Sequence, residues 1–148
     1  MDVPKDFRDL LALFNAHGVE YVVVGAYALA FHGAPRFTGD MDILVRPSSN
    51  NAQSVLAALA EFGFQFPNLT ADDFQKPDMV IQLGVPPVRI DLITAISGVT
   101  WEEAAAQKEP GLFGDVPVHF LGRRQYIQNK LAAGRRKDLA DLEALGEL

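Results

Sequence analysis

The chain has 148 residues, no cysteine and a net charge of −6. This length fits a single domain, residues 1–148, and the lack of cysteine excludes disulfides and thiolate metal sites. The acidic balance argues against a protein that coats nucleic acid through a broad basic face. The longest apolar run, residues 21–31, is shorter than the roughly 20 residues that span a bilayer, and no apolar signal segment opens the chain. We therefore expect a cytoplasmic protein that does not enter the membrane.

Helical and strand patterns alternate along the chain, which indicates a mixed α/β (α+β) domain with helices over a sheet. Helices are expected over residues 5–16, 26–31 and 49–62, and as a C-terminal pair near 123–133 and 135–145. A capping-box pattern at residues 100–103 opens a further short helix. Strands are expected over residues 20–24, 40–45, 79–83, 88–93 and 116–121, the third and fourth as an antiparallel hairpin. Residues 65–77 have the composition of a loop with a turn of helix.

The strand at residues 40–45 carries two acids. Side chains alternate along a strand, so Asp40 and Asp42 share one face while Met41 and Ile43 point to the core. Two carboxylates this close repel each other, and each is costly to bury alone. A divalent cation such as magnesium removes both problems, because it prefers hard oxygen ligands.

A third acid, Asp91, lies near the middle of the apolar strand 88–93. If this strand lies beside the first, three carboxylates converge, as two-metal phosphoryl transfer requires. The alternative is that Asp91 pairs with Arg89, two residues away on the same face. Asp-x-Asp by itself is a weak motif, usually found at a strand end or turn.

The preceding segment supports the phosphate interpretation. Strand 20–24 leads directly into Gly25, Ala26 and a short helix. A glycine lets the backbone approach a ligand closely, and the amides at a helix start suit phosphate. A glycine required only by a tight turn is the alternative.

Together these residues resemble the minimal nucleotidyltransferases of the polymerase-beta-like superfamily. The residues that carry the resemblance are Gly25-Ala26, then His32-Gly33, Arg36, Thr38, Asp40-Met41-Asp42 and, later, Asp91. It looks most like nucleotidyltransferases associated with toxin–antitoxin and abortive-infection systems. The resemblance implies the nucleotidyltransferase fold, two Mg²⁺ or Mn²⁺ ions held by the three acids, and a nucleoside triphosphate such as ATP as substrate. One departure is Ala26, which stands where relatives carry a serine or glycine and so lacks the serine hydroxyl.

The C-terminal helices carry a similar signature, with Lys130 followed by Lys137-Asp138. The resemblance implies a catalytic role for Lys130 and nucleotide-binding roles for Gly25, Ala26, Arg36, Thr38 and Asp138. Arg36 is equally well explained as a surface loop residue, Lys130 as a solvated helix residue, and Asp138 as an ordinary first-turn acid. Residues 122–137 contain six basic side chains and no acid, so we expect part of this stretch to border the same cleft.

Two functions follow from this pattern. The first is transfer of a nucleoside monophosphate from a triphosphate to a hydroxyl of a protein, an RNA or a small molecule, with Asp91 activating the hydroxyl. The second is a catalytically weak or inactive binding subunit that acts through a toxin or antitoxin partner. An unrelated α/β domain with coincidental acids is a third, weaker option.

Overall fold

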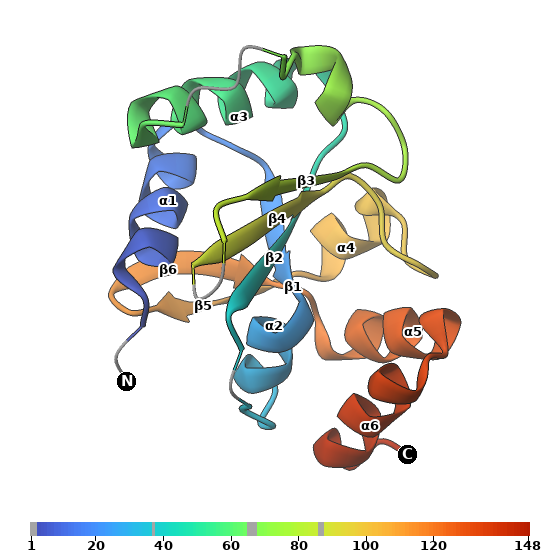
Figure 1. Cartoon of the computed structure of the whole chain (residues 1–148). Helices are drawn as coiled ribbons and strands as arrows, with labels where there is room; N and C mark the ends of the chain where they lie inside the picture. Colours follow the sequence, from blue (N-terminus) through green and yellow to red (C-terminus); the bar gives the residue numbers. More distant parts are fainter. Residues whose placement is uncertain (1–2, 37, 65–67, 86–87) are drawn as a thin grey trace.

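The computed structural model describes residues 3–36, 38–64, 68–85 and 88–148, and its centre is one six-stranded mixed sheet (Figure 1). The strand order is β3-β4-β2-β1-β6-β5. The strands are β1 (Tyr21–Val24), β2 (Asp40–Val45), β3 (Val80–Leu83), β4 (Arg89–Ile93), β5 (Glu109–Phe113) and β6 (Val116–Phe120). The β2–β4 and β1–β6 pairs are parallel, and the β1–β2, β3–β4 and β5–β6 pairs are antiparallel.

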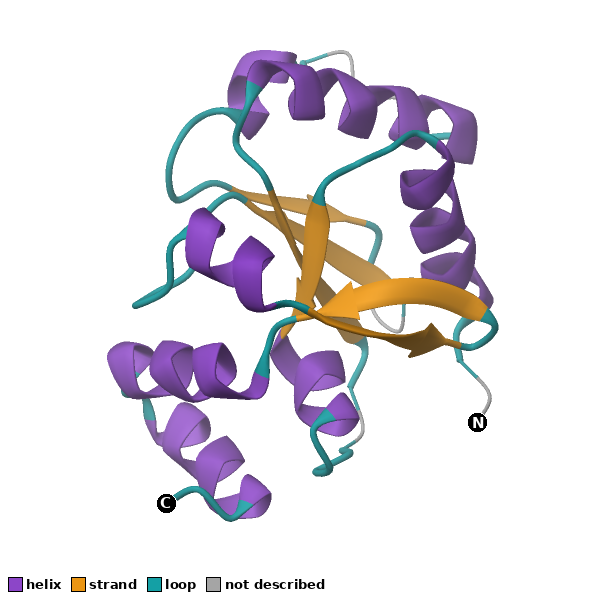
Figure 2. Cartoon of the chain, turned by 180° about the vertical axis from the view of Figure 1, so that it is seen from behind, coloured by secondary structure: helices purple, strands orange, loops and turns teal. Residues whose placement is uncertain are grey.

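Helices cover both faces of this sheet, as Figures 1 and 2 show from opposite sides. They are α1 (Lys5–Ala16), α2 (Gly25–Phe31), α3 (Ser49–Phe62), α4 (Trp101–Gln107), α5 (Arg123–Ala133) and α6 (Arg136–Leu145), with a 3-10 turn η1 at Ala71–Phe74. The expected capping box opens α4, where the Thr100 hydroxyl accepts from the Glu103 amide at 3.1 Å. The described part of the chain contains no helix long and apolar enough to cross a membrane.

Two apolar cores lie on the two faces of the sheet. Met41 and Ile43 of β2 are fully buried in the core that includes the apolar faces of α1 and α3. Leu44, on the other face of β2, belongs to the core shared with α2, α4, α5 and α6. The alternation predicted for β2 is therefore confirmed, and Asp40 and Asp42 lie on the face that carries α2 and the C-terminal helices.

The predicted α/β class, the hairpin of β3 and β4, and the C-terminal pair of helices are confirmed. Strand β5 was not expected, because Pro110 and Gly111 have the composition of a turn. Proline is tolerated in this strand because β5 lies at the edge of the sheet. The expected loop at residues 65–77 contains η1, while residues 65–67 lie outside the described residues, as do residues 86–87 of the hairpin connection.

Candidate active site

The three predicted acids come together on one face of two neighbouring strands. In the parallel pairing of β2 with β4, Asp42 lies opposite Asp91 and Asp40 lies opposite Arg89. Residues in register on adjacent strands project to the same side of a sheet, so all four side chains share that face. The conditional expectation that strand 88–93 lies beside strand 40–45 is thus confirmed.

Gly25 makes the close packing around Asp42 feasible. Its φ of +67° is in the left-handed region, and a Cβ added there would lie 2.4 Å from Oδ2 of Asp42. Any side chain at this position would displace the carboxylate or the backbone. Glycine is therefore required here both by the backbone conformation and by the proximity of an acid.

The surroundings of Asp42 disfavour its negative charge. Burial, followed by the nearby charges of Asp91 and Asp40, raises the pKa of Asp42 to about 6, while Lys130 acts in the opposite direction. Within the described residues, no lysine or arginine forms an ion pair with Asp40 or Asp42. The Asp40 amide donates to the Thr38 hydroxyl oxygen at 3.1 Å, which fixes the backbone at the start of β2.

Asp91 has a cationic partner. Arg89 donates from Nε to Oδ1 and from Nη2 to Oδ2 of Asp91, each over 3.1 Å. The Asp91 side chain is only 10% exposed whereas that of Arg89 is 32% exposed, so the carboxylate is shielded from water more than its bidentate partner. The pairing with Arg89 that the sequence left open is present, in addition to the register with Asp42.

The donor set has the chemistry of a magnesium site. Asp40 and Asp42 offer hard carboxylate oxygens without a competing ion pair, and Asp42 carries a charge that its surroundings disfavour. Among the described residues, no three carboxylate or imidazole side chains already cluster closely enough to hold a metal ion. Arg89, which engages both oxygens of Asp91, is a direct competitor for that ligand. The residues thus fit a divalent cation, with Asp40 and Asp42 as the most available ligands.

The C-terminal helices bring a lysine to this face. The Lys130 ammonium of α5 lies 3.2 Å from Oδ1 of Asp138 and 3.2 Å from Oδ2 of Asp141, both on α6. It also lies 5.5 Å from the centroid of the Tyr126 ring. Lys130 is 8% exposed, so two carboxylates and an aromatic face hold its position. The view of Lys130 as a freely solvated helix residue is therefore wrong.

Asp138 is fully buried and organises this end of the site. Burial acts to raise its pKa, but hydrogen bonds from Arg135 and Lys130 outweigh burial and lower the pKa to about 2. The Arg135 amide donates to Oδ2 at 3.1 Å and the guanidinium donates to the same carboxylate. Because both oxygens are occupied, Asp138 acts on the position of Lys130 and Arg135.

A cleft of about 440 Å³ collects most of the predicted site. Its lining combines the carboxylates of Asp40, Asp42 and Asp141 with basic side chains. The residues that line it are Gly25, Ala26, Arg36, Thr38, Asp40, Asp42, Lys130, Arg135, Lys137, Ala140 and Asp141. Asp91 is not among the residues that line this cleft, and Asp138 lines the neighbouring cleft.

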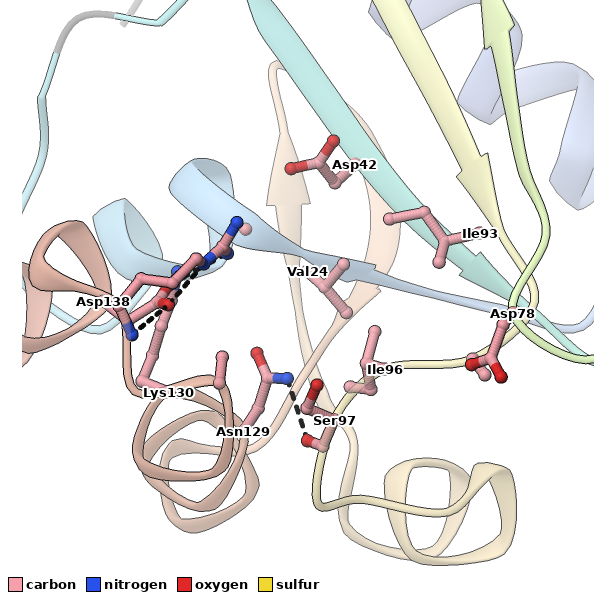
Figure 3. A pocket seen from close by; sticks show the side chains of 13 residues that line it. Val24, Asp42, Asp78, Ile93, Ile96, Ser97, Asn129, Lys130 and Asp138 are labelled. Atoms are coloured by element: carbon pink, nitrogen blue, oxygen red, sulfur yellow. Dashed lines mark hydrogen bonds and ion pairs between the residues drawn. The ribbon is translucent and has the colours of Figure 1, made fainter.

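A second cleft, of about 280 Å³, adjoins the first and shares Gly25, Asp42, Lys130 and Arg135 with it. Figure 3 shows Asp42 above this cleft, Lys130 and Asp138 on one side, and Asp78 on the opposite side. Val24, Ile93 and Ile96 lie between them and form an apolar floor. Asp42 and Lys130 therefore stand at the junction of a basic cleft and a more apolar one.

Part of the basic stretch lies elsewhere. Arg123 donates to the carbonyls of His32, at 2.9 Å, and Leu145, at 3.2 Å, and so ties α5 to α2 and to the C-terminus. The expectation that part of residues 122–137 borders the site is confirmed for Lys130, Arg135 and Lys137.

One contributor, Asp141, was missed from the sequence. Asp141 pairs with Lys130 and, at 3.4 Å, with Arg36. It lies three residues after Asp138 on α6, a spacing that places both acids on one helix face. That spacing was the available signal.

Comparison with known proteins gives structural neighbours only. No family model matches the sequence, and no curated protein matches it. A solved structure assigned as a nucleotidyltransferase, from Thermotoga maritima, superposes with a TM-score of 0.62 at 16% identity, covering 93% of this chain and 88% of that chain. The lincosamide antibiotic adenylyltransferase LnuA, bound to lincomycin, gives a TM-score of 0.61 at 15% identity, covering 97% and 96%. The chain has the nucleotidyltransferase fold.

Proposed function

We propose that this protein is a metal-dependent nucleotidyltransferase that transfers a nucleoside monophosphate from a triphosphate to a hydroxyl group. The observation that carries the proposal is the register of Asp42 with Asp91, beside Asp40, at the edge of a cleft lined by four basic side chains. Paired acids on adjacent strands facing a basic cleft suit a bound cation and a polyphosphate together. Neighbours of the same fold include an adenylyltransferase, which makes ATP the first nucleotide to test.

The residues divide the work of the reaction. Arg36, Lys130, Arg135 and Lys137 face the cleft as cations for the triphosphate, and the Gly25–Ala26 backbone forms its rim. The acceptor oxygen attacks the α-phosphorus, the bond from that phosphorus to the β-phosphate oxygen breaks, and pyrophosphate leaves. Asp91 takes the proton of the attacking hydroxyl, a role that requires the Arg89 guanidinium to release one of the two carboxylate oxygens that it holds. When bound at Asp40 and Asp42, magnesium supplies charge stabilisation for the transferring phosphoryl group.

Transfer of label tests this proposal. The protein is incubated with Mg²⁺, each α-³²P-labelled triphosphate and cell extract, and the labelled product is identified as protein, RNA or small molecule. We expect label transfer with the parent and none with Asp42→Asn. An absence of both label transfer and magnesium-dependent nucleotide binding would refute the proposal.

A second candidate function is a binding subunit of a toxin–antitoxin pair that retains the fold with weak or no catalysis. Ala26 favours it, because alanine lacks a hydroxyl for a phosphate oxygen, and so does the Arg89 pair that engages Asp91. This candidate predicts that Asp42→Asn leaves unchanged the effect that expression of the protein has on cell growth. Loss of that effect in a stably folded Asp42→Asn variant favours the enzyme.

A further inference from the structure

The cleft beside Asp42 does not end at Asp78. It continues into a third cleft, of about 440 Å³, and Ala95 and Ile96 line both. The third cleft is bounded by Pro47, Pro77, Val99, Thr100, Trp101 and Glu102, among others. A groove therefore runs from the catalytic carboxylates along residues 93–97 to the start of α4.

The segment that floors this groove is firmly held. The Thr94 hydroxyl donates to the Lys76 carbonyl at 2.7 Å and accepts from the Met79 amide at 2.9 Å. Further along, the Asn129 amide of α5 donates to the Ser97 carbonyl at 3.0 Å, as drawn in Figure 3. Such a wall is preorganised, so a ligand in the groove orders little chain on binding.

The lining of the groove differs in character from that of the triphosphate cleft. Ile93, Ile96 and the half-buried Trp101 provide apolar and aromatic surface. Asp78 and Glu102 are exposed acids, and among the described residues no cation forms an ion pair with either. Asp78 is the one described non-glycine residue with a positive φ, 56°, a conformation that aspartate tolerates.

The basic residues are concentrated at the other side of Asp42. Arg36 and Lys137 line only the triphosphate cleft, and Lys130 and Arg135 lie at the junction. Arg46, the one basic side chain among the described residues that line the third cleft, pairs with Glu20 at 3.1 Å. The cations therefore lie in the triphosphate cleft and at its junction with the groove, while the part of the groove beyond the junction offers apolar surface and two acids without an ion-pair partner among the described residues.

We infer that the groove is the acceptor site, and that the acceptor is a small hydroxylated molecule with an apolar or aromatic ring and a protonated amine. The ring packs on Ile96 and Trp101, the amine faces Asp78, and the hydroxyl reaches the face of Asp42 and Asp91. This inference rests on the proposed nucleotidyl transfer and narrows its acceptor.

Charge and size both favour this class over a polymer. A nucleic acid would place phosphates beside Asp78 and Glu102, where like charges repel. The two compartments together are of the size that drug-like ligands fill, and their linings combine apolar side chains with polar groups that could orient a small molecule. A serine-bearing protein is the remaining alternative and is an arm of the test.

Trp101 is the only tryptophan of the chain, so its fluorescence reports directly on the groove. The parent protein with Mg²⁺ and ATP is titrated with lincomycin and ephedrine, each of which carries a hydroxyl, a ring and a basic amine. A uridine hexanucleotide and a serine-containing peptide are titrated in parallel. We expect a saturable fluorescence change with at least one amine and none with the hexanucleotide or the peptide. No saturable change with either amine, or a change with the nucleic acid or peptide alone, overturns the inference.

The variant Asp78→Asn separates specific recognition from general binding, because asparagine keeps the size and tolerates the same φ. Amine affinity should fall about three- to fivefold, as expected for loss of one exposed ion pair. Asp72→Asn, an exposed acid in η1 outside the groove, is the matched control and should leave it unchanged. Equal affinities in parent and Asp78→Asn would contradict the assigned role of Asp78. Failure of the proposed function is recognised separately, as absence of magnesium-dependent nucleotide binding in any variant.

Discussion

Arg89 and Asp91 form a two-pronged ion pair, with both carboxylate oxygens of the buried acid at 3.1 Å from guanidinium nitrogens. The pair lies directly beside Asp42, on the face where the fold assembles its carboxylates. Arg89 therefore neutralises the charge of Asp91, the carboxylate that a bound metal ion would otherwise share with Asp40 and Asp42. Competition between the guanidinium and a divalent cation for Asp91 follows from this arrangement.

Arg89→Gln should make the fold depend on magnesium. In chelator the variant leaves Asp91 without a partner next to Asp42, and we expect a loss of about 1–3 kcal/mol in the free energy of unfolding. Added magnesium should then stabilise the variant more than the parent, because it no longer displaces Arg89. Thermal melts across a magnesium titration measure both effects. Arg46→Gln, which removes an exposed arginine paired with Glu20, is the control. Equal magnesium responses in Arg89→Gln and parent would show that Arg89 and the cation do not compete.

Asp42→Asn should stabilise the metal-free protein in a pH-dependent way. The folded-state pKa of Asp42 is about 6, above its ordinary value of 3.8. The folded state therefore holds the proton more tightly, and the parent loses stability as pH rises from about 4 to 6. Asparagine has no such proton, so the variant should be more stable above pH 6, by at most about 3 kcal/mol. Urea unfolding in chelator at pH 5 and pH 8 measures the difference, which should be larger at pH 8. The same difference at both pH values would contradict the raised pKa.

Asp138→Asn should destabilise the protein, in contrast to Asp42→Asn. Asp138 is fully buried and pairs with Lys130 and Arg135, so removal of its charge leaves the ammonium with Asp141 alone. We expect a loss of about 3 kcal/mol of stability, typical for breaking a buried ion pair. Its lowered pKa means that the contribution of Asp138 is present above about pH 4 and disappears as the pH falls toward 2. Glu143→Gln on the exposed face of α6 is the control. Parent-like unfolding of Asp138→Asn at pH 7 would show that the pair is not stabilising.

Gly25→Ala should cost more than the backbone conformation alone explains. A Cβ at Gly25 would lie 2.4 Å from the Asp42 carboxylate, whereas a Cβ at Gly18, with the same φ of +67°, meets nothing within 4 Å. Gly18→Ala therefore measures the conformational penalty, about 1 kcal/mol, and Gly25→Ala should exceed it. Chemical unfolding of both variants gives the comparison. Equal losses would show that Asp42 moves aside freely.

The sequence was sufficient for the elements that rest on local patterns. Apolar alternation placed Asp40 and Asp42 on one face, and an acid within an apolar strand singled out Asp91. The sequence alone does not predict that β2 pairs with β4, because strand order depends on long-range packing that no local pattern encodes. The convergence of the three acids therefore remained conditional on that pairing.

Other features depended on tertiary context. Strand β5 escaped notice because Pro110 and Gly111 favour a turn, and only the edge position of the strand makes them acceptable. The network of Lys130 with Asp138 and Asp141 requires α5 and α6 to pack against each other, which helical periodicity alone does not specify. The role of Asp141 was visible only as a three-residue spacing from Asp138.

The central claim is that Asp40 and Asp42 hold a cation and a nucleoside triphosphate in the basic cleft, and paired melting curves test it most directly. Parent, Asp40→Asn and Asp42→Asn are melted in chelator, with Mg²⁺ alone, and with Mg²⁺ and ATP, followed by the other triphosphates. A ligand at about 100 times its dissociation constant stabilises the native state by roughly 2.7 kcal/mol. We predict that the parent gains this stabilisation only when metal and nucleotide are both present, and that neither variant does, although both melt no earlier than the parent in chelator. Equal stabilisation of all three proteins, or none with any triphosphate, would contradict the claim.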